Sequence, residues 1–338
     1  MVDGNALDMA RIGTRFSHGV KDGTEGYDGQ FVYFIARNPN PDVVVDHLDV
    51  PSYRYQRILL PLLGRVFSFG DENLIPWTLL LLGITMQSTG TLVVSKLLAG
   101  WGVNRWYAIT YGLWPGLVAA VRVMLPEPLA FALVAGAIYS NKRGKSHLSL
   151  LLYALAIFTK EVTVLFVFGH LIVEIVGRNW KRVVGLLVYT ILPFALFQIW
   201  LLNTFGQLGI GSGGANATSF ELIPFMGLFR ILPLSATLFS VYLLLYLPFL
   251  FVPFGWGLLK GLKKAFISKG FDLVNWILIV NVAVIPFLPF STYREPGGML
   301  RFMSGMALAL LLFAGKYKYY RALNYSPFWL ALNFILFR

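Results

Sequence analysis

Residues 233–258 read PLSATLFSVYLLLYLPFLFVPFGWGL, an apolar run without a single charged side chain. A helix needs about 20 apolar residues to cross a hydrocarbon core about 30 Å thick, and this run is long enough. Lipid offers no water to an unpaired backbone, so such a segment is expected to cross as a helix. The run is also far longer than a barrel strand, which favours an all-α membrane fold.

The composition of the whole chain supports a polytopic membrane protein. Of its 338 residues, 57% are hydrophobic and 13% are charged, and the mean hydropathy is +0.67. Soluble domains carry about 25% charged residues, so the bulk of this protein is expected to face lipid. The net charge of +12 does not indicate a nucleic-acid partner, because the basic residues lie in short loops between apolar runs, as membrane orientation demands.

The apolar runs predict about ten transmembrane helices, whose ends are defined to within a few residues. They lie at about 75–98, 106–122, 127–141, 147–159, 162–177, 183–202, 233–258, 273–290, 302–315 and 326–337. If the runs cross alternately, one set of loops collects most of the basic residues, which by the positive-inside rule marks the cytoplasmic face. These residues are Lys96, Arg105, Lys142, Arg143, Lys145, Arg178, Lys181, Arg182, Lys260, Lys263, Lys264, Lys269, Lys316, Lys318 and Arg321.

The opposite, extracytoplasmic face receives an acidic first segment. Residues 1–72 hold ten of the sixteen acidic residues and are expected to face water, whereas residues 73–338 form the transmembrane domain. Within the first segment, residues 57–69 are apolar but too short to span, which fits an interfacial helix. Counting the crossings also places the N-terminus outside. We therefore expect a further transmembrane helix ahead of this sequence, and the alternative is that the first segment is translocated without one.

The first segment contains the candidate catalytic base. The stretch Gly26-Tyr27-Asp28-Gly29-Gln30 places a carboxylate directly before the long series of apolar helices. A charged side chain without a functional role is unusual at such a position. Further along, Arg54 and Arg57 are spaced by three, which places both on one helix face. Guanidinium groups suit phosphate oxygens by bidentate geometry, so these arginines are candidates for binding a donor phosphate. Supporting roles are expected for Tyr27, Gln30 and Tyr53.

Further charges lie between the apolar runs. Ionisable groups at membrane depth cost about 2.5 to 3.5 kcal/mol each, so each is a functional candidate. Lys160 and Glu161 follow one another without turn residues around them; the alternative is an adjacent ion pair that caps a tight helical hairpin. Arg122 and Glu127 repeat the pattern, and there the alternative is a helix end held by a charge pair. Lys160 is a candidate for binding the donor phosphate, with Glu127 and Glu161 in support.

Arg294 and Arg301 flank the turn Glu295-Pro296-Gly297-Gly298. A mobile turn at the mouth of a helix would deliver their guanidinium groups to a phosphate, and the alternative is snorkelling to the membrane interface. The glycine-rich tract 206–214 likewise allows two interpretations, a mobile lid over an active site or a flexible linker without a further role.

The sequence predicts no metal centre. No two of the four histidines have the spacing of a metal-binding pair, and the chain has no cysteine. Asp46, His47 and Asp49 give only a weak signal for a divalent cation. No cofactor is expected, although a divalent cation remains compatible with the sequence.

Several of these stretches together resemble a known family. They are Gly26 to Phe31, Ala36-Arg37-Asn38-Pro39, Asp49, Tyr53 to Leu59 and Thr159-Lys160-Glu161. The combination resembles prokaryotic integral-membrane glycosyltransferases of the GT-C superfamily, and the Tyr-Asp-Gly is similar to the Trp-Asp-Gly of the GPI mannosyltransferases. The resemblance covers most of the chain in topology, and its motifs lie mainly in residues 26–61 and 159–161.

The resemblance implies a polyprenyl-phosphate-linked sugar as donor and a lipid, glycan or protein acceptor. It also implies transfer on the extracytoplasmic face of a prokaryotic cell membrane, with an acidic residue of the first external loop as base; only Asp28 matches that position. Such a carboxylate takes the proton of the acceptor hydroxyl as the hydroxyl attacks the anomeric carbon. One carboxylate without a nucleophilic partner favours single displacement with inversion. The leaving phosphate would be stabilised by Arg54, Arg57, Lys160, Arg294 or Arg301.

Two other classes of protein compete with this interpretation. A transporter or flippase of lipid-linked sugars needs no covalent chemistry. Transporters often show internal repeats and broken helices near the middle of the membrane, whereas this sequence shows no repeat and gathers its unusual charges at one surface. An inactive assembly subunit is the third alternative.

Overall fold

A computed structural model describes residues 5–267 and 271–336 of the chain. Helix makes up 74% of the described residues, which contain no strand, and this confirms the all-α prediction. Asp3 of the acidic segment and Lys269 of the basic loops lie outside the described residues. The chain folds into two compact units, each built from three separate stretches of sequence.

The first unit comprises Met1–Gly90, Leu117–Val162 and Tyr189–Ala215. Its elements include η1 (Ala6–Ala10), α1 (Thr14–Ser17), α2 (Gly29–Arg37), α3 (Pro41–Val44), η2 (Val45–His47), α4 (Pro51–Tyr55), α5 (Leu59–Phe67), α8 (Pro115–Arg122), α9 (Glu127–Lys142), α10 (Ser146–Thr159), η5 (Leu187–Ile191) and α13 (Leu192–Phe205). The acidic segment packs with later parts of this unit, since α4 contacts α13 and α5 contacts α10.

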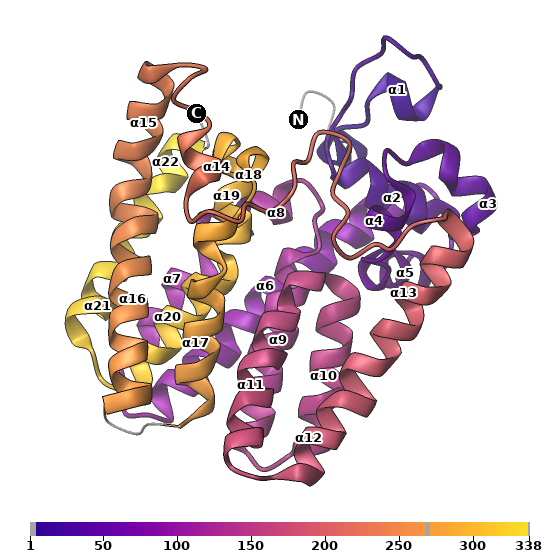
Figure 1. Ribbon diagram of the computed structural model, residues 1–338. Helices are drawn as coiled ribbons and strands as arrows, with labels where there is room; N and C mark the ends of the chain where they lie inside the picture. Colours follow the sequence, from indigo (N-terminus) through magenta and orange to yellow (C-terminus); the bar gives the residue numbers. More distant parts are fainter. Residues whose placement is uncertain (1–4, 268–270, 337–338) are drawn as a thin grey trace. The chain divides into compact units, whose positions relative to one another are not determined.

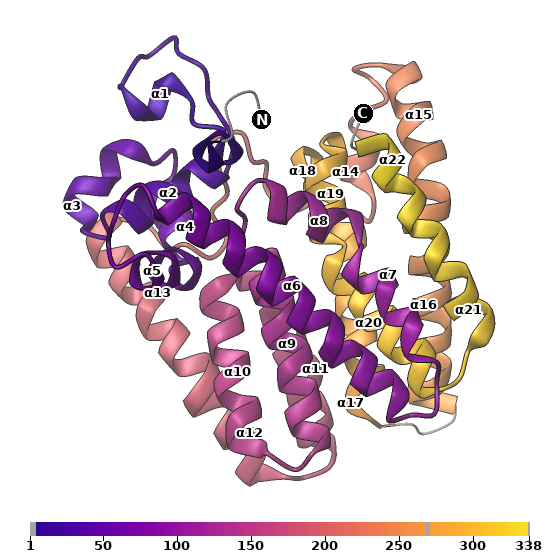
Figure 2. The ribbon, with the colours of Figure 1, turned by 180° about the vertical axis from the view of Figure 1, so that it is seen from behind.

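An antiparallel hairpin of α9 and α10 forms the core of the first unit (Figures 1 and 2). Helix α9 is apolar on nearly every side, and Leu129, Phe131 and Val134 are almost fully buried. A helix that is hydrophobic all round is stable only when it is enclosed. After α10 the backbone becomes extended at Lys160 and turns at once into η4 (Glu161–Thr163). This bend places two charged residues at the end of the hairpin.

The second unit comprises Thr91–Gly116, Thr163–Val188 and Asn216–Arg338. Its elements include η3 (Arg105–Ala108), α7 (Ile109–Gly112), α11 (Val164–Val176), α12 (Trp180–Leu186), α14 (Met226–Phe229), α15 (Ala236–Tyr246), η6 (Leu247–Phe251), α16 (Val252–Leu262), η7 (Lys263–Ile267), α17 (Leu273–Ala283), η8 (Ile285–Phe287), α18 (Phe290–Arg294), α19 (Pro296–Phe302), α20 (Ser304–Lys316), α21 (Tyr320–Tyr325), η9 (Ser326–Ala331) and α22 (Leu332–Leu336). Helix α17 lies at its centre and packs against α11, α16 and α20.

Prolines modify the predicted apolar runs in two ways. The run at 106–122 is not one helix, because α7 ends at Gly112 and α8 begins at Pro115. The helix is interrupted here because a residue that precedes a proline disfavours the helical conformation. The run at 233–258 continues through its prolines, but the turn η6 around Pro248 widens to a π-helix. A proline lacks the N–H of the helical ladder, and such a widened turn accommodates the loss.

Within residues 5–267 and 271–336, three helices are long and apolar enough to cross a membrane. They are α6 (Ile75–Ala99) and the continuous helical segments Trp180–Phe205 and Ala236–Ile267, and the pair Pro296–Phe302 and Ser304–Lys316, bent by 43°, would be a fourth if it forms one span. In the third, Leu244 is 71% exposed and Leu259 is 70% exposed. Large apolar surfaces of this kind are typical of contact with lipid or a partner. The helices agree with the general prediction of a membrane protein.

Candidate functional site

Arg54 lies between two carboxylates of the first unit. Its Nη1 atom is 3.0 Å from Oδ1 of Asp28, and its Nε and Nη2 atoms donate to Oδ1 and Oδ2 of Asp49 at 2.7 and 2.8 Å. The side chains of Arg54 and Asp49 are only 8% and 7% exposed, whereas that of Asp28 is 29% exposed. Asp28 is therefore the accessible end of a charged row formed by Asp28, Arg54 and Asp49.

The residues around Asp28 explain how its carboxylate is presented. Gly26 has a φ of +68°, a left-handed conformation that favours glycine. A Cβ atom on Gly29 would lie 2.2 Å from the carbonyl oxygen of Val123, so α2 can begin this close to the neighbouring backbone only with glycine. Asp28 stands at the N-cap position of α2 but makes no capping hydrogen bond. Its side chain extends to Arg54 instead.

Gln30 and Tyr27 hold the loop that precedes α2. The Gln30 side chain is fully buried, accepts from the Gly13 N–H at 3.0 Å and donates to the Glu25 carbonyl at 2.6 Å. The backbone N–H of Tyr27 donates to the carbonyl of Arg11 at 2.9 Å. Gln30 thus fixes the loop on which Asp28 lies.

Aromatic rings flank the two arginines. The Cζ atom of Arg54 lies 4.3 Å from the ring centroid of Phe31 and 5.0 Å from that of Tyr53. The Arg57 Cζ lies 4.2 Å from the ring centroid of Tyr53, and Arg57 Nη2 donates to the Tyr53 hydroxyl at 2.6 Å. Cation–π contacts of this kind stabilise a desolvated guanidinium group. The Tyr53 ring therefore contacts both arginines.

A second group of charges, the paired cluster, contains Arg57, Glu161, Lys160 and Glu127. Arg57 binds both carboxylate oxygens of Glu161, at 2.8 and 2.6 Å, and Lys160 Nζ lies 2.6 Å from Oε1 of Glu127. The adjacent residues Lys160 and Glu161 thus each have a partner from another part of the first unit. The Glu127 side chain is completely buried, so its pairing with Lys160 compensates a charge that water does not reach.

The pKa values of the buried groups follow from these pairs. Burial raises the pKa of Glu161, but the charge and hydrogen bonds of Arg57 outweigh it and lower the value to about 2. Burial also raises the pKa of Asp49, yet the hydrogen bonds and charge of Arg54, with the N–H groups of Ala215 and Val50, hold it below its ordinary value. Both carboxylates are ionised at neutral pH as a result.

The charges of the row and the cluster nearly cancel. Asp28, Asp49, Glu127 and Glu161 supply one more formal charge than Arg54, Arg57 and Lys160. These three cations, which are among the five that the sequence proposes for phosphate binding, therefore each have a carboxylate partner. A phosphate would have to share these cations rather than find them unoccupied.

The glycine-rich tract reaches the charged row through its backbone. The N–H of Ala215 donates to Oδ2 of Asp49 at 3.1 Å, and the N–H of Ile210 donates to Oε1 of Gln198 at 2.9 Å. A Cβ atom on Gly214 would lie 2.8 Å from Nη2 of Arg54. The tract therefore lies directly against the buried end of the row.

The first unit brings together seven of the predicted site residues, namely Asp28, Arg54, Arg57, Tyr53, Lys160, Glu127 and Glu161. Arg294 and Arg301 belong to the second unit. There the exposed Arg294 guanidinium lies 5.3 Å from the Phe290 ring centroid, and Nη2 of Arg301 is 3.7 Å from Oε1 of Glu295.

The sequence connects Asp49 only with a weak cation signal and with the family resemblance, and does not predict its pairing with Arg54. Its signal in the sequence is its position five residues before Arg54, on the other side of Pro51, where α4 begins. Such a carboxylate and guanidinium can meet across the start of a helix, but the spacing alone does not require it. The structure assigns Asp49 as the bidentate partner of Arg54.

Among the residues that the structure describes, no three His, Cys, Asp or Glu side chains are grouped to hold a metal ion. His47 stacks on Phe34, and its Nδ1 atom lies 2.6 Å from the carbonyl oxygen of Phe16. The described contacts of this histidine are therefore those of packing. In comparisons with other proteins, the chain matches no protein-family model, no curated protein and no solved structure.

Proposed function

We propose that the protein is an integral-membrane glycosyltransferase of the GT-C type with about ten transmembrane helices. It would transfer a sugar from a polyprenyl-phosphate donor to an acceptor hydroxyl at the extracytoplasmic face. The observation that carries the proposal is the partly exposed carboxylate of Asp28 at the end of an otherwise buried charged row. The apolar helices and the segregation of basic loops support the membrane location, and the sequence resemblance supports the reaction class.

In this proposal Asp28 is the general base. It takes the proton of the acceptor hydroxyl while the hydroxyl oxygen forms a bond to the anomeric carbon. The bond between that carbon and the phosphate oxygen breaks at the same time, and the polyprenyl phosphate leaves with the electron pair. A single displacement inverts the anomeric centre. Arg54 acts as a positioning residue, because its bidentate bond to Asp49 fixes the guanidinium group that faces Asp28.

The negative charge on the leaving phosphate needs cationic donors. Arg57 and Lys160 would serve by sharing hydrogen bonds between their carboxylate partners and the phosphate. Arg294, whose guanidinium group is exposed, and Arg301 belong to the second unit, and phosphate binding by these two residues stays a prediction from the sequence.

The test is sugar transfer by the purified protein in proteoliposomes. Labelled polyprenyl-phosphate sugars would be supplied with a lipid extract as acceptor, and the product would be followed by chromatography. The Asp28→Asn variant should lose transfer while keeping the yield and thermal stability of the wild type. The matched control is Asp22→Asn, which changes an exposed aspartate of the same segment and should leave transfer unchanged.

Two outcomes would overturn the assignment. Transfer that survives Asp28→Asn would remove Asp28 from the role of base. Movement of the labelled lipid across sealed vesicles without any covalent product would instead favour the transporter or flippase.

A further inference from the structure

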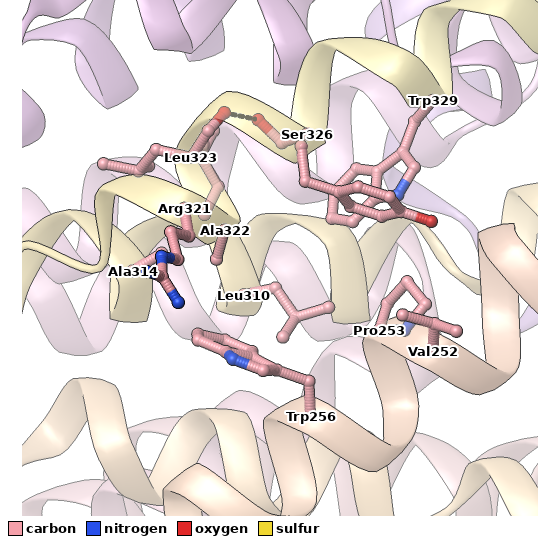
Figure 3. Close-up of a pocket in the computed structure, with 12 residues that line it drawn as sticks. Val252, Pro253, Trp256, Leu310, Ala314, Arg321, Ala322, Leu323, Ser326 and Trp329 are labelled. Carbon is pink, nitrogen blue, oxygen red and sulfur yellow. Dashed lines mark hydrogen bonds between the residues drawn. The ribbon is translucent and has the colours of Figure 1, made fainter.

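The second unit contains a cavity of about 390 Å³ (Figure 3). Its walls come from α16, α20, α21 and η9. Pockets that hold small molecules measure about 300–1,000 Å³, so this cavity is large enough for part of a ligand. None of the residues proposed for sugar transfer lines it.

The wall of the cavity is mainly apolar. Val252, Pro253 and Trp256 contribute one side, and Leu310 and Leu311 contribute another. The first three lie in Ala236–Ile267, a helix long and apolar enough to cross a membrane, and the two leucines lie in the bent pair that would form a further span. A hydrocarbon chain therefore suits this wall better than a water-soluble metabolite.

Arg321 supplies the charged end of the cavity. Figure 3 shows its guanidinium group extending from α21 toward the side of Trp256. Among the described residues Arg321 forms no ion pair, whereas the nearby Lys316 is paired with Asp272 at 2.9 Å. Another cation lies close by: Lys260 Nζ is 5.8 Å from the ring centroid of Tyr319, which itself packs against Trp256 at 5.5 Å. This end of the cavity is suited to an anionic group.

Trp329 adds an unused hydrogen-bond donor to the wall. Its side chain lines the cavity and is 4% exposed, and its Nε1 atom has no acceptor among the described residues. A buried donor without a partner is unfavourable, and an oxygen of a bound molecule would satisfy it. In the view of Figure 3, Trp329 and Arg321 lie toward opposite ends of the cavity. The two donors therefore fit a molecule with an anionic head and a second acceptor oxygen.

We propose that this cavity binds an anionic membrane phospholipid. The lipid phosphate pairs with Arg321, an ester oxygen accepts from Trp329, and one acyl chain lies along the leucines of α20. Basic pockets between transmembrane helices are suited to such headgroups, because the phosphate is held while the chain stays in apolar surroundings. The inference rests on the proposed membrane insertion, but it does not depend on sugar transfer.

The experiment measures lipid binding without any assay of activity. The detergent-purified full chain would be mixed with phosphatidylglycerol or phosphatidylcholine of identical acyl chains, and retained lipid would be counted by native mass spectrometry. We expect preferential retention of phosphatidylglycerol, and Arg321→Gln should weaken that retention about fivefold, the effect of one basic residue near an anionic lipid. Arg321→Lys should recover part of it. The control Lys181→Gln, at an exposed lysine of α12, should have no effect.

A second variant tests the cavity itself. Ala322 lines it and is partly exposed, so Ala322→Trp would fill the space without changing charge and should displace the lipid. Equal retention of the two lipids, or a preference that survives both Arg321→Gln and Ala322→Trp, would overturn the proposal. Displacement of the lipid by inorganic phosphate alone would also overturn it, because the occupant would then be a free anion.

Discussion

Arg54 binds Asp49 through two parallel hydrogen bonds of 2.7 and 2.8 Å, and this pair fixes the guanidinium group that faces Asp28. A bidentate guanidinium–carboxylate contact sets an orientation as well as a distance. The position of the proposed base is therefore controlled by a buried residue that has no place in the chemistry itself.

Asp49→Asn should lower sugar transfer without removing the base. The amide cannot accept both hydrogen bonds from Arg54, so the guanidinium group and Asp28 become less well positioned. Misplacement of a catalytic group by about 1 Å costs up to about a hundredfold in rate, and we expect a loss of tenfold to a hundredfold in kcat with a smaller change in the KM of the donor. Steady-state transfer kinetics in proteoliposomes would measure both.

Arg54→Lys provides the matching test from the other side of the pair. Lysine keeps the charge but lacks the planar fork, so it should lose transfer to a similar extent. If Asp49→Asn and Arg54→Lys both leave kcat at the wild-type value, the buried end of the charged row does not position Asp28.

Glu161 should make the protein sensitive to acid. Burial alone would raise the pKa of Glu161 above its ordinary value of 4.5. The charge and hydrogen bonds of Arg57 outweigh burial and lower this pKa to about 2. A lowered pKa in the folded state gives stability that is complete above the unfolded-state pKa and is lost as the pH falls through the folded-state value. The window therefore runs from about pH 4.5 down to about pH 2. The shift corresponds to roughly 3 kcal/mol at neutral pH.

The measurement compares the wild type with Glu161→Gln, which has no carboxylate to titrate. Unfolding in detergent would be followed from neutral pH to a pH of about 3. The stability difference between the two proteins should be constant above pH 4.5 and should shrink below it. A difference that does not change with pH would show that the Arg57 pair adds no acid-dependent stability.

Sequence patterns predict the helices of this protein better than their interruptions. The predicted run at 127–141 begins with α9 at Glu127, and the run at 147–159 ends with α10 at Thr159, because a change between apolar and charged residues marks these boundaries directly. The break before Pro115 lies within an apolar run, so hydropathy does not reveal it. Only the restriction that proline places on the preceding residue would have indicated it.

The candidate site, too, is only partly predictable from local sequence patterns. Asp28 and Arg54 are visible as unusual charges, but their partners depend on how distant segments meet. Arg57 and Glu161 are 104 residues apart in the sequence, and no local pattern connects them. Sequence reasoning therefore identifies the charged groups, and the fold decides which of them are balanced.

Lys160→Met should destabilise the fold, because it leaves the fully buried Glu127 without its cationic partner. Removal of one member of a buried pair typically costs about 3–5 kcal/mol. The double variant Lys160→Met with Glu127→Leu should recover most of this loss, since it removes the uncompensated charge as well. Unfolding of the three proteins in detergent would measure the effect. A double variant that is less stable than Lys160→Met alone would contradict this explanation.

Gly214→Ala tests whether the glycine-rich tract controls the geometry of the charged row. The new methyl group would lie 2.8 Å from Nη2 of Arg54 and 3.2 Å from Oδ2 of Asp49, and the buried guanidinium cannot yield without lengthening its bonds to Asp49. We expect transfer to fall about tenfold, because the row is displaced at its buried end. The hydrogen bond from Ala215 to Asp49 should weaken as the row is displaced, and limited proteolysis of the loop would detect this change.

The control Ser219→Ala, at an exposed position further along the same loop, should change neither sugar transfer nor protease resistance. Wild-type transfer and wild-type protease resistance in Gly214→Ala would show that the tract rests on the row without constraining it.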